Sequence, residues 1–189
     1  MAQAVLPAPY RFSRQEYDHL AEEGFFEGKK VELLDGVIVT MSPQNSPHAS
    51  AIYSVLMALL RVLGSAFCVR PQLPIVLDDW SEPEPDLAVC RPDRVDYKHA
   101  HPRAEQVLVV VEVASSSLPY DRGAKAAAYA RSGIPAYWIV NLQDGTIEVL
   151  TRPDRMACRY ALREVRAASD PLVLPGDTSV TVAELLPHA

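Results

Sequence analysis

The sequence predicts an α/β domain in which helices flank a mixed central β-sheet. Helical and extended apolar patterns alternate along the chain, as they do when helices cover a sheet. The stretch VLVVVEVA at residues 107–114 is apolar at seven of its eight positions, which indicates a strand covered on both faces. A strand, a helix and a second strand follow one another across residues 107–141, and we expect them to form a right-handed parallel crossover.

Length and composition limit the class of protein. The 189 residues fit a single domain spanning residues 1–189, and 49% apolar with 22% charged residues is typical of a globular chain. No run of eighteen apolar residues predicts a membrane helix, and the start MAQAVLPAPYRF does not resemble a signal peptide. We therefore expect a cytoplasmic protein with no membrane partner. The three cysteines are far apart, which favours free thiols over disulfides or a zinc site.

The first half of the chain is expected to contain two helices, a hairpin and an acidic loop. The capping-box pattern SRQE at residues 13–16 predicts a helix to about residue 23. Asp35-Gly36 joins two short apolar runs in VELLDGVIVTMS and predicts a β-hairpin. A second helix begins at SPH, residues 46–48, and ends at Gly64. After an extended segment, the proline-rich loop DDWSEPEPD leads to the short strand LAVC.

The second half is expected to supply most of the sheet. A polar loop over residues 91–106 precedes the valine-rich strand, and residues 115–120 form a turn. The sequence DRGAKAAAYARSG predicts a helix with Asp121 as its N-cap and Gly133 at its end. IPAYWIVNL and IEVLTR are expected to pair as strands, and the tail to add one or two strands and a short closing helix.

Glu112 is the one charged residue in the valine-rich strand. A buried carboxylate is usually neutralised, paired or bound to a metal. Asp86 stands at the head of the preceding strand, LAVC. If the two strands are neighbours, the carboxylates converge to about 4 to 6 Å, because adjacent strands lie about 4.8 Å apart. Two acids so close repel each other unless a cation lies between them, and oxygen ligands alone select Mg²⁺ or Mn²⁺.

Spacing alone does not decide the roles of these residues. Asp86 could merely end a loop, and Glu112 could pair with a buried arginine or lysine. Lys125 lies one turn into the helix after the Glu112 strand, so its side chain could reach back over the end of that strand. It could equally form a surface pair with Asp121, four residues earlier.

The chain contains, in this order, VELLDGVIV, SPH at a helix start, PEPDLAV, VVVEVASSS and YDRGAKAAAYARSGIPAYWIVN. Together these stretches resemble the Uma-two family of endonucleases, which belongs to the PD-(D/E)XK, restriction-endonuclease-like superfamily. The resemblance runs from about residue 12 to about residue 150, and its most specific part is E-V-x-S-x-S followed by D-x-x-x-K-x-x-x-Y. It implies a restriction-endonuclease-like fold and the metal-dependent hydrolysis of phosphodiester bonds, with DNA as the expected substrate.

The resemblance also implies roles for individual residues. Asp86 matches the aspartate of the P-D motif and Glu112 the second acid, and both would be ligands of Mg²⁺ or Mn²⁺. Glu32 matches an additional acid that can hold a metal-bound water. The lysine expected two residues after the second acid is replaced by Ala114, and Lys125 stands where a helix lysine of the family would be. Lys125 would orient the attacking water or stabilise the developing negative charge.

Ala114 keeps other classes of function open. If loss of the strand lysine abolishes catalysis, the chain would be an inactive, nuclease-derived module that binds nucleic acid or a protein. In a third interpretation the acid cluster is merely structural, and Asp86→Asn would leave stability unchanged or raise it. A homodimer would allow both strands of a duplex to be cut, but the sequence contains no recognisable dimer interface.

Charge is the main objection to a DNA substrate. The net charge of −6 and the pI near 5.3 do not favour non-specific binding to phosphates. Basic residues are concentrated at 91–103 and 152–166. Each stretch could supply local positive charge or be an ordinary solvated surface.

Five weaker candidates complete the sequence-based prediction. His48 could position substrate or metal, but capping or packing is its expected role. Gln72 could point into the acid cleft or lie on an edge strand, and Glu84 could be a further ligand or a solvated loop charge. Tyr129 is expected to pack. Residues 115–117 are expected to form a turn, because no G-x-S-x-G elbow accompanies these serines.

Overall fold

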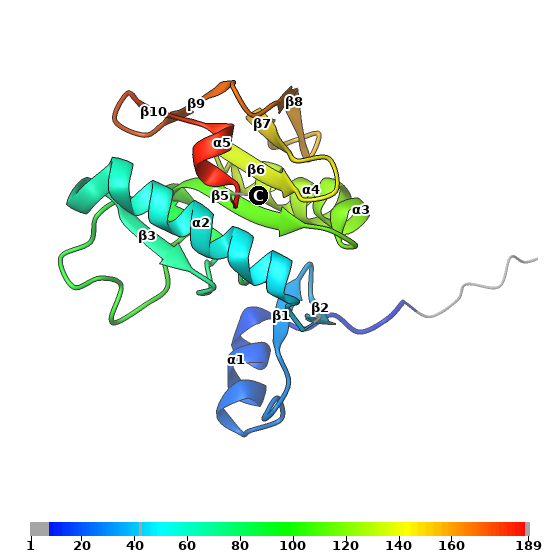
Figure 1. Ribbon diagram of the computed structural model, residues 1–189. Coiled ribbons are helices and arrows are strands. Elements are labelled where there is room, and N and C mark those ends of the chain that lie inside the picture. Colours follow the sequence, from blue (N-terminus) through cyan, green and yellow to red (C-terminus); the bar gives the residue numbers. More distant parts are fainter. Residues whose placement is uncertain (1–7, 42, 188–189) are drawn as a thin grey trace, which may run out of the picture.

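A mixed sheet of six strands forms the centre of the fold in the computed structural model, which describes residues 8–41 and 43–187 (Figure 1). The strand order is β3-β4-β5-β6-β7-β8. Their bounds are β3 (Cys68–Pro71), β4 (Leu87–Cys90), β5 (Val107–Ala114), β6 (Ala136–Asn141), β7 (Thr146–Asp154) and β8 (Arg159–Arg166). Strands β5 and β6 are parallel, and the other neighbours are antiparallel. The predicted mixed sheet and its parallel crossover are confirmed.

Strand β5 is covered on both faces, as its valine-rich sequence predicts. Val109, Val111 and Val113 belong to the core on the face that α2 (Ser46–Leu63) covers. Val110 and Ala114 belong to the core on the opposite face, together with Ala128 and Tyr129 of α4 (Ala126–Ser132). Because side chains alternate along a strand, Glu112 lies on the α4 face.

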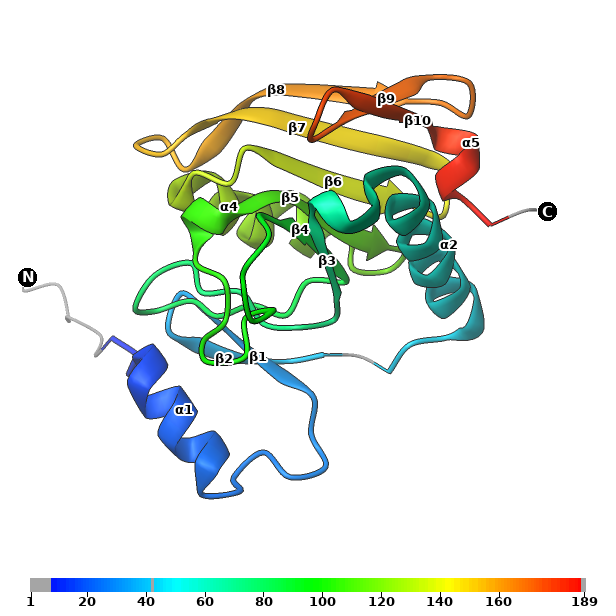
Figure 2. The same ribbon diagram turned by 90° about the vertical axis from the view of Figure 1, so that its left-hand side faces the viewer.

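Helix α2 crosses one face of the sheet (Figures 1 and 2). Asn45 caps it, with its side chain accepting a hydrogen bond from the His48 amide, and Gly64 ends it. Its buried residues are Ala51, Ile52, Val55, Ala58, Leu59 and Leu63. Residues 46–66 are long and apolar enough to cross a membrane, with a mean hydropathy of 1.6, but the buried face packs against the core of this fold.

The N-terminal elements lie below the sheet in Figure 1. Helix α1 (Arg14–Glu22) begins with the predicted capping box between Ser13 and Glu16. Strands β1 (Val31–Leu34) and β2 (Val37–Thr40) form the predicted antiparallel hairpin. Its turn residues both have positive φ, 52° at Asp35 and 74° at Gly36. A Cβ atom on Gly36 would lie 2.6 Å from the Arg11 Cβ, so glycine is required there on two grounds.

The helical segment after β5 differs from the prediction. It begins at Leu118 with α3 (Leu118–Tyr120), continues through one π-helical turn (Asp121–Lys125) and ends with α4 at Gly133, which has φ 80°. Asp121 is therefore inside a continuous helical segment, and its prediction as an N-cap is wrong. Pro119, in the first turn, occupies the position that proline favours at a helix start.

The C-terminal part contains more strand than predicted. Besides β8, it forms the hairpin of β9 (Pro171–Leu174) and β10 (Thr178–Thr181), followed by the closing helix α5 (Val182–Leu185). Leu172, Val180 and Leu185 join the core cluster that includes α2. The three cysteines are free thiols, although Cys68 and Cys90 are paired positions on β3 and β4.

Candidate active site

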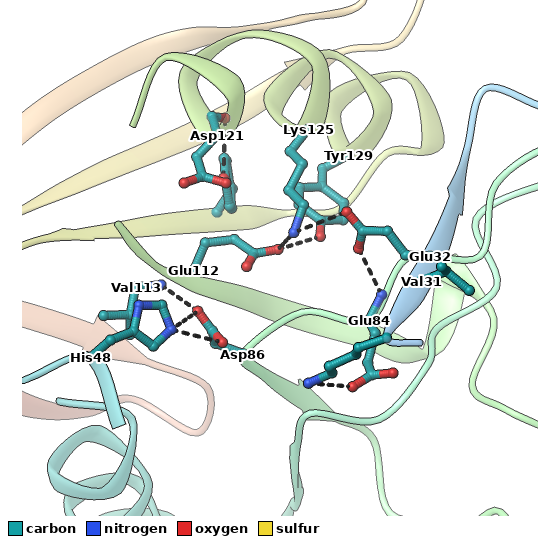
Figure 3. A network of polar contacts seen from close by, with 12 residues as sticks. Val31, Glu32, His48, Glu84, Asp86, Glu112, Val113, Asp121, Lys125 and Tyr129 are labelled. Atoms are coloured by element: carbon teal, nitrogen blue, oxygen red, sulfur yellow. Dashed lines mark hydrogen bonds and ion pairs between the residues drawn. The ribbon is translucent and has the colours of Figure 1, made fainter. Parts of the chain in front are cut away.

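Five parts of the chain meet around a cavity of about 390 Å³ at the carboxyl end of β5. They are the hairpin of β1 and β2, the segment that leads into the start of α2, the residue before β4, the end of β5 and the helical segment after it (Figure 3). The carboxylates that line the cavity belong to Glu32, Asp86, Glu112 and Asp121, and Lys125 lines it as well. All four residues that were predicted as a site are therefore brought together.

Asp86 is fixed at the head of β4 by its neighbours. Strands β4 and β5 are adjacent, with Leu87 paired with Val111, so Asp86 faces the end of β5. Its Oδ2 accepts a hydrogen bond of 2.8 Å from the Val113 amide, and the His48 Nε2 lies 3.4 Å from the carboxylate. His48 therefore contacts the predicted site, whereas capping or packing was its expected role.

Glu112 is 4% exposed, as the apolar strand around it predicts. Its Oε1 accepts hydrogen bonds of 2.8 Å from the Lys125 Nζ and from the Tyr129 hydroxyl. Burial raises the pKa of Glu112 to about 8, against the opposing effect of the Lys125 charge. Among the residues that the structure describes, no hydrogen bond reaches its second oxygen, Oε2. Tyr129 thus does more than pack, because it orients this carboxylate.

Lys125 is buried, with 6% of its side chain exposed. Its Nζ also lies 3.4 Å from the Glu32 Oε1. Burial alone would lower the pKa of Lys125, but the carboxylates of Glu112 and Glu32 raise it above its ordinary value. Lys125 is therefore a buried cation held by two acids, and the alternative of a surface pair with Asp121 is wrong.

Glu32 reaches the cavity from β1 and is 2% exposed. Its Oε2 accepts a hydrogen bond of 3.2 Å from the Glu84 amide. The Glu84 side chain pairs with Lys30 at 2.9 Å and does not line the cavity. The Gln72 amide donates to the Asp86 carbonyl oxygen, and the Gln72 side chain lies outside the cavity wall. The structure therefore excludes Glu84 and Gln72 from the site.

Asp121 lines the cavity although the sequence pattern assigned it only a capping role. It is 2% exposed, and its Oδ2 is buried without a hydrogen-bond partner in residues 8–41 and 43–187. Burial raises the pKa of Asp121. The spacing D-x-x-x-K could have revealed it, since residues four apart on a helix share a face. The serines at 115–117 also line the cavity, beyond their predicted role as a turn.

Comparisons with known proteins give the family and the fold. A family model described as Uma2, "Putative restriction endonuclease", matches residues 14–183. The chain belongs to the Uma2 family. Five chains of solved structures match. One is described as the crystal structure of a "putative nuclease belonging to DUF820" from Anabaena variabilis ATCC 29413, with a TM-score of 0.69 and 15% identity over 94% of this chain and 97% of that chain. A comparison with curated proteins found no match.

The Uma2 chain therefore has the predicted restriction-endonuclease-like fold, an α/β fold with a mixed central sheet flanked by helices. The likeness at this identity concerns the fold. The neighbour with this fold is described as a "putative nuclease".

The donor atoms of this Uma2 site suit a hard divalent cation. Asp86 and Glu112 are both more than nine-tenths buried, face one cavity and present only oxygen. Within the described residues, no three His, Cys, Asp or Glu side chains are grouped closely enough to hold a metal. The protein would therefore supply about two ligands, as is usual for Mg²⁺, which keeps several waters and uses substrate oxygens.

The two basic stretches of this Uma2 chain do not line the cavity. Residues 91–106 connect Cys90 to Val107, at the opposite end of β5 from Glu112. The turn between β7 and β8 also lies at that far end, because Thr151 pairs with Ala136 at the start of β6. Lys30 and Lys125 are the lysines that line the cavity. Arg163 and Arg166, the last arginines of the second stretch, continue along β8 away from that far end, and Arg166 pairs with Ile147. Neither basic stretch is part of the cavity wall.

Proposed function

We propose that this protein is a nuclease that hydrolyses phosphodiester bonds, with DNA as substrate and Mg²⁺ or Mn²⁺ as cofactor. The observation that carries the proposal is the convergence of Asp86, Glu112 and Lys125 on one cavity. Membership of the Uma2 family, described as "Putative restriction endonuclease", supports the class of reaction. The metal rests on the oxygen donors of the cavity, and DNA as substrate rests on the family description.

Asp86 and Glu112 are the residues that would hold the cation. Oδ2 of Asp86 is fixed by the Val113 amide, and Oε1 of Glu112 is fixed by Lys125 and Tyr129. Glu112 therefore keeps Oε2 without a hydrogen bond among the described residues, and the Oδ1 of Asp86 has a 3.4 Å contact with the His48 Nε2. When bound, the cation supplies neutralisation of charge on the scissile phosphate and a lowered pKa for a bound water.

Lys125 is the residue best placed to act on the water or phosphate. An ammonium group has three hydrogens, and Glu112 and Glu32 account for two of them. The third can be donated to an attacking water or to a non-bridging phosphate oxygen. Glu32 would keep Lys125 charged and oriented toward the cavity, and it would not bind the metal.

The experiment that tests the proposal is cleavage of duplex DNA, and of RNA in parallel, with Mg²⁺ or Mn²⁺. Wild type is compared with Asp86→Asn, Glu112→Gln and Lys125→Met. We expect each variant to lose about 100-fold or more in rate. Asp79→Asn, an exposed aspartate outside the cavity, is the matched control and should cut like wild type.

A nuclease-derived binding module is the alternative that the same experiment separates. If wild type binds DNA without cutting it, and Lys125→Met binds equally well, the catalytic proposal is wrong. Cleavage of RNA but not of DNA would show that the substrate is RNA.

A further inference from the structure

Two free cysteines face each other across the strands β3 and β4. Cys68 and Cys90 are register partners in this antiparallel pair. Cys90 belongs to the core cluster on the α4 face, and Cys68 packs against the same cluster, so both thiols lie on one face of the sheet. Cα atoms of directly opposite residues lie about 4.5 to 5.5 Å apart, and a disulfide needs about 4.4 to 6.8 Å. The strand register therefore allows a disulfide without movement of either strand.

The two thiols differ in their access to solvent. Strand β3 is the edge of the six-stranded sheet, and Cys68 is partly exposed there. Cys90 lies on the inner neighbour, β4, and is 0% exposed. A small oxidant in solution can therefore reach Cys68 but not Cys90. Redox-active pairs combine an accessible thiol with a neighbouring thiol that resolves it, and this pair has that arrangement.

A buried guanidinium lies beside the accessible thiol. Arg70 is two residues after Cys68 on β3, so both side chains are on the same face. Arg70 is 6% exposed, its Cζ lies 5.3 Å from the centroid of the Tyr97 ring, and its Nε has no hydrogen-bond partner within residues 8–41 and 43–187.

The charge of Arg70 separates the roles of the two thiols further. Burial raises the pKa of the Cys68 thiol, and the Arg70 charge opposes that rise. Burial raises the pKa of Cys90 to about 12. Since the thiolate is the form that attacks an oxidant, Cys68 is the thiol suited to react first.

We propose that Cys68 and Cys90 are a reversible redox pair, in which a peroxide oxidises Cys68 and Cys90 then closes a disulfide. The Cys68 sulfur attacks one peroxide oxygen, the O–O bond breaks, and a sulfenic acid and one water form. The Cys90 sulfur attacks the Cys68 sulfur, the S–O bond breaks, and a second water leaves with the Cys90 proton. Two sulfurs are oxidised and one hydrogen peroxide is reduced. This inference does not depend on the proposed function.

The disulfide would connect the edge strand to the strand that follows Asp86. It would close the loop over residues 68–90, which includes Asp86 and the acidic segment before it. A crosslink of this kind restricts the unfolded chain, so oxidation should raise the melting temperature by about 5 °C or more. An added thiol such as dithiothreitol should reverse the change.

The test treats the reduced, folded protein with hydrogen peroxide and blocks the remaining thiols with an alkylating agent before digestion. We expect wild type to lose two of its three free thiols and to give one peptide pair, joined through Cys68 and Cys90. Cys158→Ala is the matched control, since Cys158 is also partly exposed, and it should form the same bond. In Cys90→Ala the sulfenic acid should persist at Cys68, where dimedone labels it. In Cys68→Ala dimedone should not label Cys90.

Five outcomes would overturn the inference. They are three intact thiols in wild type, a bond that involves Cys158, a bond between two copies of the chain, a dimedone label on Cys90, and a lower melting temperature after oxidation. The peptide map and the melting temperature of wild type decide the question even if an alanine variant fails to fold.

Discussion

Glu112 combines a structural cost with a chemical use. Its strand is apolar on both faces, so the carboxylate is desolvated, and two buried donors compensate for that loss at Oε1. Those same donors fix the side chain and leave Oε2 toward the cavity. The donors that offset the cost of burying Glu112 are therefore also the groups that orient it.

Tyr129 provides a residue-scale prediction. Tyr129→Phe removes the hydroxyl that donates to Glu112, while Lys125 still donates to the same oxygen. We expect a loss of roughly 1 to 2 kcal/mol in the free energy of unfolding and about a 10-fold loss in cleavage rate. Urea denaturation and a cleavage assay measure the two effects.

Tyr160→Phe is the control for that prediction. The Tyr160 hydroxyl donates to the Ile134 carbonyl oxygen at 3.0 Å, away from the cavity. This variant should lose about 1 kcal/mol of stability and no activity. Equal rates for the two variants would show that the Tyr129 hydroxyl only stabilises the fold.

Glu82, which does not line the cavity, makes the stability of the folded protein depend on pH. It is 7% exposed, and burial raises its pKa to about 7, helped by Asp18 and opposed by Arg14. Because the folded protein holds this proton more tightly than the unfolded chain does, the stabilising effect is complete below about pH 4.5. It is lost as the pH rises to about 7.

Glu82→Gln should therefore match wild type near pH 5 and exceed it at pH 8 by roughly 1 to 2 kcal/mol, after allowance for solvent screening. Denaturation curves across this pH range measure the difference. The exposed Glu22→Gln serves as a control that should follow wild type throughout. Parallel profiles for Glu82→Gln and wild type would contradict the prediction.

At the scale of elements, an ion cluster ties the helical segment to the sheet. Glu148 of β7 is 1% exposed and accepts hydrogen bonds from Arg122, in the π-helical turn, and from Arg163 on β8. The cluster therefore joins the turn that carries Asp121 and Lys125 to β8, the edge strand of the sheet.

Glu148→Gln tests that connection. The substitution removes the buried charge on which two arginines converge, so we expect a loss of roughly 1 to 3 kcal/mol in the free energy of unfolding. Glu164→Gln on the neighbouring strand is the control, because Glu164 is more exposed and pairs only with Arg166 among the described residues. It should change stability by less than about 1 kcal/mol. Equal effects in urea denaturation would show that the cluster contributes no more than a surface pair.

The elements were largely predictable because each carries a local signal. The capping box at Ser13, the turn at Asp35-Gly36 and the valine-rich run of β5 all act within a few residues. The start of the helix after β5 was placed three residues late, at Asp121 instead of Leu118. A capping rule recognises an aspartate by its type, but the burial of Asp121 depends on the tertiary fold, in which it lines one cavity with Glu32 of β1 and His48 of α2.

The site was predictable only in part, for a related reason. Neighbouring strands made the approach of Asp86 and Glu112 foreseeable, and resemblance to a family pointed to Glu32 and Lys125. The contacts of His48 and Tyr129 were not foreseeable, since both depend on how deeply a helix packs onto the sheet.

On the scale of the whole molecule, the charge distribution restricts how DNA could bind. The chain carries a net charge of −6, and neither of its basic stretches lines the cavity. Lys30 lines the cavity, and Lys29 lines the hollow beside it. The two lysines of the β1 side are thus surface cations close to the acids.

Lys29→Gln and Lys30→Gln should therefore weaken duplex binding. Removal of one phosphate contact should lower the slope of log K against log salt by about 0.9. Arg91→Gln and Arg94→Gln, at the far end of β5, are the controls and should leave the slope unchanged. Titrations at several salt concentrations measure the slope. A lower slope for Arg91→Gln and Arg94→Gln, with an unchanged slope for the two lysine variants, would place the DNA-binding surface at the far end of β5.

The division of the site between a helix and a sheet has a mechanical consequence. Lys125 is carried by the helical segment, whereas Glu112 is carried by β5 and Asp86 precedes β4. A lysine two residues after the acid, at the position of Ala114, would move rigidly with that strand. Here any slide or rotation of the helix over the sheet changes the distance between ammonium and carboxylate while the two acids stay in register. The charge balance of the cavity is thus coupled to the position of one helix.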